Sequence, residues 1–223
     1  MIRKVRVGGA LLGGGTIAVQ SMTTVKTSDV DRCVAQIVSL QDAGCDIARV
    51  AVADEGDALA LREVTARTRI PVVADVHFSA RLAVLAVENG AHKLRINPGN
   101  IGGEREIARV ADCLKAHHIP VRVGSNTGSI EKEHLKKYGR SAQALVESAL
   151  ANVAVLERCG VEDIVVSVKA SDVPLTVEAY TLLRKRCDYP LHLGVTEAGT
   201  QHMGIVKSSI GIGSLLLAGI GET

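Results

Sequence analysis

The chain has 223 residues, and 47% of them are hydrophobic, which is enough for the core of one large α/β domain but not for a second full domain. Its formal net charge is +2, with basic and acidic residues interspersed, so neither a nucleic-acid partner nor a membrane partner is indicated. Aromatic residues make up 2% and Trp is absent, which argues against a base-stacking surface for single strands.

The N-terminus and the cysteines both favour a cytoplasmic protein. Residues 1–7 carry positive charge but lack the apolar run and cleavage site of a secretion signal, and no apolar run reaches the ~18 residues of a membrane span. The five cysteines are widely spaced and form no Cys-x-x-Cys, so we expect reduced, buried thiols and no metal site. They are Cys33, Cys45, Cys113, Cys159 and Cys187.

A short hairpin opens the predicted structure. Residues 5–7 and 10–12 flank Gly8 and Gly9, a two-residue turn, and we expect the hairpin to plug one end of a barrel. Seven strands follow, at residues 17–21, 46–51, 72–76, 92–97, 121–124, 163–168 and 191–195. Helices are predicted at residues 29–43, from residue 54 onward, and at 79–89, 104–117, 141–158, 173–186 and 200–217. Residues 130–140 are predicted to be a long polar loop.

Strands that alternate with helices about every thirty residues predict a parallel sheet with right-handed crossovers. A doubly wound open sheet would have a site only at its switch point, whereas a (β/α)8 barrel gathers the carboxyl ends of all its strands into one ring. Polar residues end the second to the seventh strand, so we predict a TIM-type barrel over residues 1–223. Only seven strands are visible. We therefore expect a chain truncated before strand eight, with unpaired edges at strands one and seven.

Side chains two apart on a strand point the same way, and this alternation would bring four cations together. Arg95 and Asn97 share one face of their strand, as do Asp75 and His77 on the strand before it. The cations at the strand ends are Arg49, Arg95, Arg122 and Lys169, opposed only by Asp75 and Glu197. Guanidinium forks and a lysine ammonium suit paired oxygens, so the pattern predicts a phosphate or diphosphate site. Asn97 and Asn126 would add donors to it.

Other roles for the same residues stay open at this point. Any single arginine could pair with a carboxylate at the rim, although two acids cannot neutralise four cations. Asp75 and His77 could form a metal pair or an acid/base pair, but we favour hydrogen bonds from them to substrate hydroxyls. Lys169 could form a Schiff base, as in an aldolase-type barrel, but among arginines it more simply meets an anion.

Six strings of this sequence resemble one family. They are Ile17-Ala-Val-Gln-Ser-Met-Thr23, Val73-Ala-Asp-Val-His-Phe78, Leu94-Arg-Ile-Asn-Pro-Gly-Asn-Ile-Gly102, Val166-Ser-Val-Lys-Ala-Ser-Asp172, Pro190-Leu-His-Leu-Gly-Val-Thr-Glu-Ala-Gly199 and Gly219-Ile-Gly-Glu-Thr223. The family is that of 4-hydroxy-3-methylbut-2-enyl diphosphate synthase, the iron–sulfur enzyme of the non-mevalonate isoprenoid pathway. The resemblance runs through nearly the whole chain, and long ordered strings are far more specific than a single short motif.

The resemblance implies an oxidoreductase that opens the ring of 2-C-methyl-D-erythritol 2,4-cyclodiphosphate, with loss of water, by two electrons delivered through a [4Fe–4S] cluster. The substrate-binding residues that it implies are Arg49, Asp75, His77, Arg95, Asn97, Arg122, Asn126 and Lys169. Asp75 would position the carbon skeleton, and Glu197 would be the catalytic proton donor. The expected electron donor is flavodoxin or ferredoxin, and full-length members are expected to form head-to-tail homodimers.

The family holds its cluster in a separate C-terminal domain, through three cysteines and one glutamate. Because no Cys-x-x-Cys occurs in this chain, we expect that iron–sulfur domain to be absent and the barrel alone to bind substrate without turnover. Two other functions stay open. One is a pterin- or phosphosugar-binding barrel that makes or breaks C–C bonds, and the other is a non-catalytic binding module.

Overall fold

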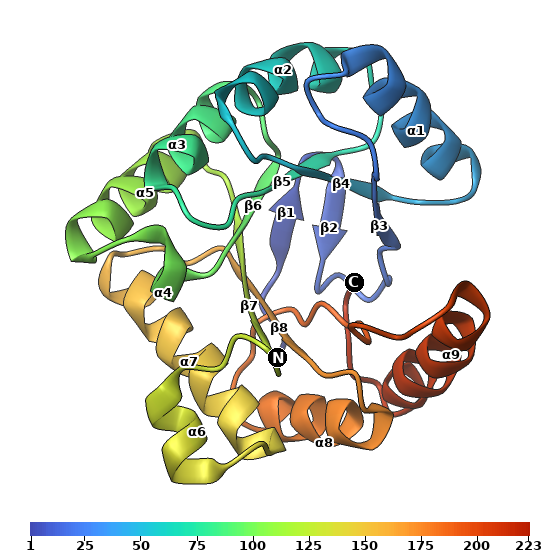
Figure 1. Ribbon diagram of the computed structural model, residues 1–223, viewed down its shortest axis with the longest axis vertical. Helices are drawn as coiled ribbons and strands as arrows, with labels where there is room; N and C mark the ends of the chain where they lie inside the picture. The colour runs from blue at the N-terminus through green and yellow to red at the C-terminus, as the bar shows by residue number, and fades with distance from the viewer.

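Six parallel strands curl into most of a ring, with the helices that join them on the outside (Figure 1). This computed structural model describes residues 1–223. Strands adjacent in sequence are also adjacent in the sheet, as expected when each strand–helix–strand unit crosses over in the same hand. The strands are β3 (Gln20–Met22), β4 (Ile47–Ala51), β5 (Val72–Asp75), β6 (Lys93–Ile96), β7 (Val121–Asn126) and β8 (Ile164–Lys169).

The main apolar core lies between the strands and the surrounding helices. Val72, Leu94 and Ile164 face outward from their strands and are fully buried in this core, because alternate residues of a strand face opposite sides. The helices are α1 (Val30–Asp42), α2 (Glu55–Ala66), α3 (Ala80–Glu88), α4 (Pro98–Ile101), α5 (Glu104–His117), α6 (Lys132–Tyr138), α7 (Ala142–Arg158), α8 (Val173–Arg184) and α9 (Gln201–Leu217). None of these helices combines the length and the apolar character that a membrane crossing would require.

The N-terminal hairpin closes one end of the ring, which confirms that expectation. Strands β1 (Val5–Val7) and β2 (Ala10–Leu12) pair antiparallel and lie inside the ring in Figure 1. Their side chains form a second small core with inward-facing residues of three barrel strands. This core consists of Val5, Val7, Leu12, Ile47, Val73 and Val165. The floor of the barrel interior is therefore apolar and excludes water.

Leu12→Ala is expected to lower the free energy of unfolding by about 2–5 kcal/mol, because Leu12 is fully buried in this floor and its truncation leaves a cavity. Urea unfolding followed by circular dichroism measures the loss. The matched control is Leu59→Ala on α2, where the leucine is 54% exposed and the change should stay within about 0.5 kcal/mol. Equal losses in the two variants would show that the hairpin does not seal the barrel.

The closing edge of the ring differs from the sequence prediction. The prediction of a regular seventh strand at residues 191–195 was wrong. The single β-bridge in this segment is an isolated parallel one, between Leu191 and Val166. The expectation that the first and seventh strands have unpaired edges was also wrong, because the last residues of the chain pair with both segments. The N–H of Leu193 donates to the carbonyl of Thr223 at 2.7 Å, and that of Ala18 donates to the carbonyl of Glu222 at 3.0 Å. Residues 220–223 therefore occupy the place of an eighth strand at the base of the ring.

Two glycines and the Glu222 carboxylate explain how residues 220–223 reach the place of the eighth strand. Gly219 and Gly221 have φ values of +71° and +116°, in the region that favours glycine over any other residue. The Glu222 carboxylate accepts from the Leu191 N–H at 2.6 Å and from Arg184 Nη2 at 2.7 Å. These contacts tie the last residues both to the seventh segment and to α8.

Two connections on the carboxyl side of the strands contain helices that were not predicted. Residues 130–140 were expected to be a loop, but they include α6. This helix has no buried residues, so its polar sequence lacks the apolar periodicity that would have predicted it. Strand β6 ends at Ile96, before Pro98, and the short helix α4 begins at Pro98. Proline is tolerated in a first helical turn because its missing N–H would have no helical partner.

Candidate functional site

The interior of the barrel changes from apolar to charged along each strand. On β4, Ile47 belongs to the floor and Arg49 lies two residues further on, and on β5 Val73 and Asp75 are arranged in the same way. Parallel strands end at the same edge, so the charged side chains collect above the floor, at the carboxyl end of the ring. The alternation along each strand thus places a polar site directly on top of an apolar plug.

Asp75 is the centre of the ion pairs in this site. Its Oδ1 lies 3.0 Å from Arg95 Nη1 and its Oδ2 lies 3.7 Å from Arg49 Nε, and the Asp75 and Arg95 side chains are at most 10% exposed. Burial by itself would raise the pKa of the Asp75 carboxyl, but the guanidinium groups of Arg95 and Arg49 outweigh it and hold that pKa below its ordinary value. Asp75 is therefore ionised at neutral pH.

His77 lies at the outer edge of the same cluster. Its Nε2 is 3.4 Å from Asp75 Oδ1, and Arg95 Nη1 is 3.0 Å from Nε2 and 3.1 Å from Nδ1. The imidazole is half exposed, so it can face a ligand in the mouth of the barrel. A guanidinium already contacts both Asp75 and His77, and this positive charge disfavours a metal ion between them.

Arg122 lies deep in the ring, whereas Lys169 is the last residue of β8 and pairs in register with Asn126. Arg122 is 2% exposed, its Nη1 donates to Ser167 Oγ at 3.2 Å, and its buried Nε has no partner. Burial and the neighbouring guanidiniums lower the pKa of Arg122 to about 9, which leaves it charged at neutral pH. A Cβ on Gly194 would lie 2.6 Å from Lys169 Nζ, so the glycine leaves the room that the lysine head group needs.

The positive charges in the ring greatly outnumber the negative ones. Five cationic side chains point into the interior from β4, β6, β7 and β8, and these are Arg49, Lys93, Arg95, Arg122 and Lys169. Asp75 is the carboxylate among them, and it pairs with Arg49 and Arg95. Glu197, the second acid that the sequence suggested, is exposed and lies outside the ion pairs. A cavity of about 290 Å³ borders Arg49 and Lys169, so an anion with several oxygens fits this place.

The remaining predicted residues lie around the rim. Asn126 ends β7 next to Lys169 in the sheet register, which leaves it beside the ring. Asn97 is buried, and its Oδ1 caps α4 by accepting from the Gly99 N–H at 3.1 Å, so only its amide NH2 is left for a ligand. Glu197 follows Thr196, whose N–H donates to Ala170 just after β8, and it has a left-handed backbone with φ of +48°.

The comparison with protein families decides what this barrel is. The model of the GcpE TIM-barrel domain matches residues 2–223, essentially the whole chain. This chain belongs to the GcpE TIM-barrel family.

Curated relatives of this GcpE barrel carry the name 4-hydroxy-3-methylbut-2-en-1-yl diphosphate synthase (flavodoxin). The relative from Caldanaerobacter subterraneus subsp. tengcongensis is 53% identical over 100% of this chain and 63% of its own length. The one from Clostridium perfringens is 50% identical over 99% of this chain and 64% of its own length. The chain therefore spans less than two thirds of the length of these relatives.

Solved structures of other enzymes share the fold of the GcpE barrel. A type I 3-dehydroquinate dehydratase from Clostridium difficile superposes with a TM-score of 0.68 at 15% identity, covering 95% of this chain and 86% of its own. Dihydropteroate synthase from Xanthomonas albilineans gives a TM-score of 0.64 at 12% identity, covering 97% and 85%. At such low identity these likenesses establish the architecture alone.

Two interior residues of the GcpE barrel were missed by the sequence analysis. Lys93 is fully buried and its Nζ is 3.1 Å from Gln20 Oε1. His192 is 6% exposed and its buried Nδ1 has no partner. Lys93 precedes Arg95 by two residues, so the same alternation rule that placed Arg95 would have placed it. His192 lies on the irregular seventh segment, where the alternation of a regular strand does not apply and therefore does not predict which side chains face the interior.

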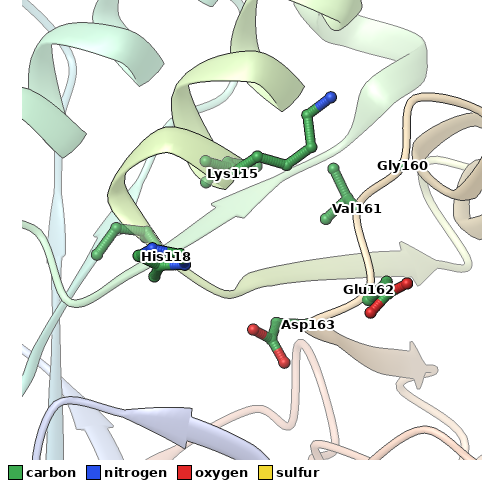
Figure 2. A pocket seen from close by; sticks show the side chains of 8 residues that line it. Lys115, His118, Gly160, Val161, Glu162 and Asp163 are labelled. Carbon is green, nitrogen blue, oxygen red and sulfur yellow. The ribbon is translucent and has the colours of Figure 1, made fainter.

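A second cavity lies at the opposite end of the GcpE barrel, near the amino ends of β7 and β8. It measures about 240 Å³. Figure 2 shows Lys115 and His118 on the α5 side of this cavity, and Glu162 and Asp163 on the segment that leads into β8. Active sites of such barrels form at the carboxyl ends of the strands, and these mixed charges do not make an anion site. We therefore assign the functional site to the cation ring.

Proposed function

We propose that this chain is the substrate-binding barrel of a 4-hydroxy-3-methylbut-2-enyl diphosphate synthase. The observation that carries the proposal is the ring of five basic side chains, three of them buried, around the single carboxylate of Asp75. Such an excess of buried positive charge is costly unless an anion enters the ring. The diphosphate of 2-C-methyl-D-erythritol 2,4-cyclodiphosphate would supply that anion, and the relatives' name, which is that of a diphosphate synthase, supports a diphosphate ligand.

The site residues divide into those that hold the diphosphate and those that face the carbon skeleton. Arg49, Arg95, Arg122, Asn126 and Lys169 would bind the diphosphate oxygens, with Arg122 the most deeply buried of these side chains. Asp75 orients Arg95 and Arg49 through its ion pairs and accepts from a substrate hydroxyl. His77 and the Asn97 amide add contacts at the mouth. Glu197, exposed at the rim, would donate the proton that leaves with water.

The whole reaction takes two electrons, opens the cyclic diphosphate and releases water. A [4Fe–4S] cluster would supply those electrons, but the cysteines of this chain do not fit one. All five are free, and no group of three or more His, Cys, Asp or Glu side chains is placed to hold a metal. We therefore assign binding and orientation to this barrel, over residues 1–223. The cluster belongs to another domain, with flavodoxin or ferredoxin as donor and a homodimer as the working form.

One observation favours a different chemistry at the same site. The amine of Lys169 is buried, and burial with the nearby guanidiniums holds its pKa well below its ordinary value, as a Schiff-base lysine requires. A phosphosugar-type barrel that handles C–C bonds would use it in this way. Borohydride trapping of a keto phosphosugar on Lys169, detected by mass spectrometry, would favour that second function.

Calorimetric titration with the cyclic diphosphate tests the proposed function. We expect saturable binding of one molecule per chain. Arg95→Met should weaken it about 10- to 150-fold, since hydrogen bonds to charged groups contribute about 1.5–3 kcal/mol. The control is Arg109→Met on the exposed side of α5, which should leave the affinity unchanged. The proposal fails if the cyclic diphosphate does not bind, or if both variants bind it like the wild type.

A further inference from the structure

Lys93 occupies an unusual place for a lysine. It lies on β6, between the apolar floor and the cation ring, and none of its surface is exposed. Its Nζ meets a single polar side chain, the neutral amide oxygen of Gln20 at 3.1 Å. An ammonium group has three N–H donors to satisfy, and no carboxylate pairs with this one. The position therefore disfavours the charged form of the amine.

The elements around Lys93 add further positive charge. Below it, the floor contributes only apolar side chains from β1, β2, β4, β5 and β8. The ionisable groups that face this part of the interior are Arg49 on β4, Asp75 on β5, Arg95 on β6, Arg122 on β7, Lys169 on β8 and His192 on the seventh segment. Asp75 is already paired with Arg95 and Arg49, so it does not neutralise Lys93.

Desolvation, followed by repulsion from Arg122 and Arg49, lowers the pKa of Lys93 to about 7. The same causes hold the pKa values of Lys169 and His192 well below their ordinary values. The arginines keep their charge, because even the pKa of Arg122 lies at about 9. In the empty ring the guanidiniums are thus charged, while the other basic groups can lose their protons.

We propose that the ring takes up a proton from solvent when it binds a diphosphate group, and that Lys93 is the main residue that holds this proton. The inference rests on the proposed function, because it concerns the same anion site. Bound diphosphate places negative charge beside Arg122 and Arg49, which offsets their repulsion of the Lys93 amine and raises its pKa. No other bond forms or breaks in this step, and the proton balances part of the charge of the ligand.

The direction of the pH effect follows from the two protonation states. At pH 8 the Lys93 amine is mostly neutral in the empty ring and protonated in the complex, so Lys93 takes up close to one proton there. At pH 6 the amine is protonated in both states and the uptake at Lys93 falls toward zero. Between these limits the affinity for the anion falls with rising pH, by up to about 10-fold per pH unit for one linked proton.

Titration calorimetry with inorganic diphosphate measures this proton directly. Binding enthalpies at pH 8 in two buffers with different ionisation enthalpies give the number of protons taken up. Lys93→Met should take up about one proton fewer than the wild type, and protons released by diphosphate itself cancel in this difference. The control Lys115→Met, in the cavity at the opposite end of the barrel, should match the wild type.

The outcomes separate the two proposals. If the wild type binds diphosphate and Lys93→Met takes up the same number of protons, the inference about Lys93 is wrong and the anion site stands. If the wild type does not bind diphosphate, the proposed function fails and the inference with it. Should Lys93→Met not fold, Lys93→Gln takes its place in the same comparison, because it keeps a polar group beside Gln20 and cannot take up the proton.

Discussion

Arg122→Met is expected to weaken diphosphate binding by roughly 150-fold or more, a loss of about 3 kcal/mol. Arg122 is the most enclosed guanidinium of the ring, and one of its N–H groups, on the buried Nε, has no partner in the protein. A ligand oxygen would satisfy that donor in a poorly solvated place, where charge-assisted hydrogen bonds are strong. The variant removes both this hydrogen bond and a charge that Asp75 does not neutralise.

The same variant should fold more stably than the wild type. Arg122 faces Arg49 and Arg95, and this repulsion contributes to its lowered pKa. Methionine fills much of the space without charge, so the free energy of unfolding should rise by about 1 kcal/mol. Calorimetry with inorganic diphosphate and urea unfolding give the two values, with exposed Arg105→Met as the control. Affinity within threefold of the wild type would remove Arg122 from the site.

Asp75→Asn is expected to have the opposite effect on stability. The carboxylate pairs with Arg95 at 3.0 Å and with Arg49 at 3.7 Å while nearly buried, and breaking a buried pair by removing one partner costs about 3–5 kcal/mol. Inorganic diphosphate should stabilise Asp75→Asn more than it stabilises the wild type, because the anion replaces the missing negative charge. Urea unfolding with and without diphosphate measures both effects.

The pH dependence gives a second check on Asp75. Its pKa is depressed in the folded protein, so its stabilising contribution is fully present above the unfolded value of about 3.9 and is lost as the pH falls through the folded pKa. The difference between wild type and Asp75→Asn should therefore be constant near neutral pH and shrink below about pH 4. Exposed Asp112→Asn, which loses only a surface pair with Lys115, should cost less than about 1 kcal/mol. Equal losses in the two variants would contradict the buried ion pair.

The regular part of the barrel was predictable because its strands alternate strictly between core and interior. On β4, β5 and β6, outward Val50, Ala74 and Leu94 are buried against helices, and inward Arg49, Asp75 and Arg95 reach the ring. The prediction failed where backbone pairing depends on distant residues. Leu191 pairs with Val166, and Leu193 meets Thr223 only because the ring closes, and no local pattern at residues 191–195 reveals either contact.

The sequence alone determined which residue types face the interior, since the two-residue period of a strand is a local property of the backbone. With the long matching strings, that was enough to predict the barrel, the plug at its base and most of the cations of the site. Only the tertiary structure decided which charges balance each other. It places Glu197 at the exposed rim, leaves Asp75 among five basic side chains and encloses Lys93 beside Gln20. Burial and charge balance arise from residues far apart in the chain, and they exist only once the strands have closed into a ring.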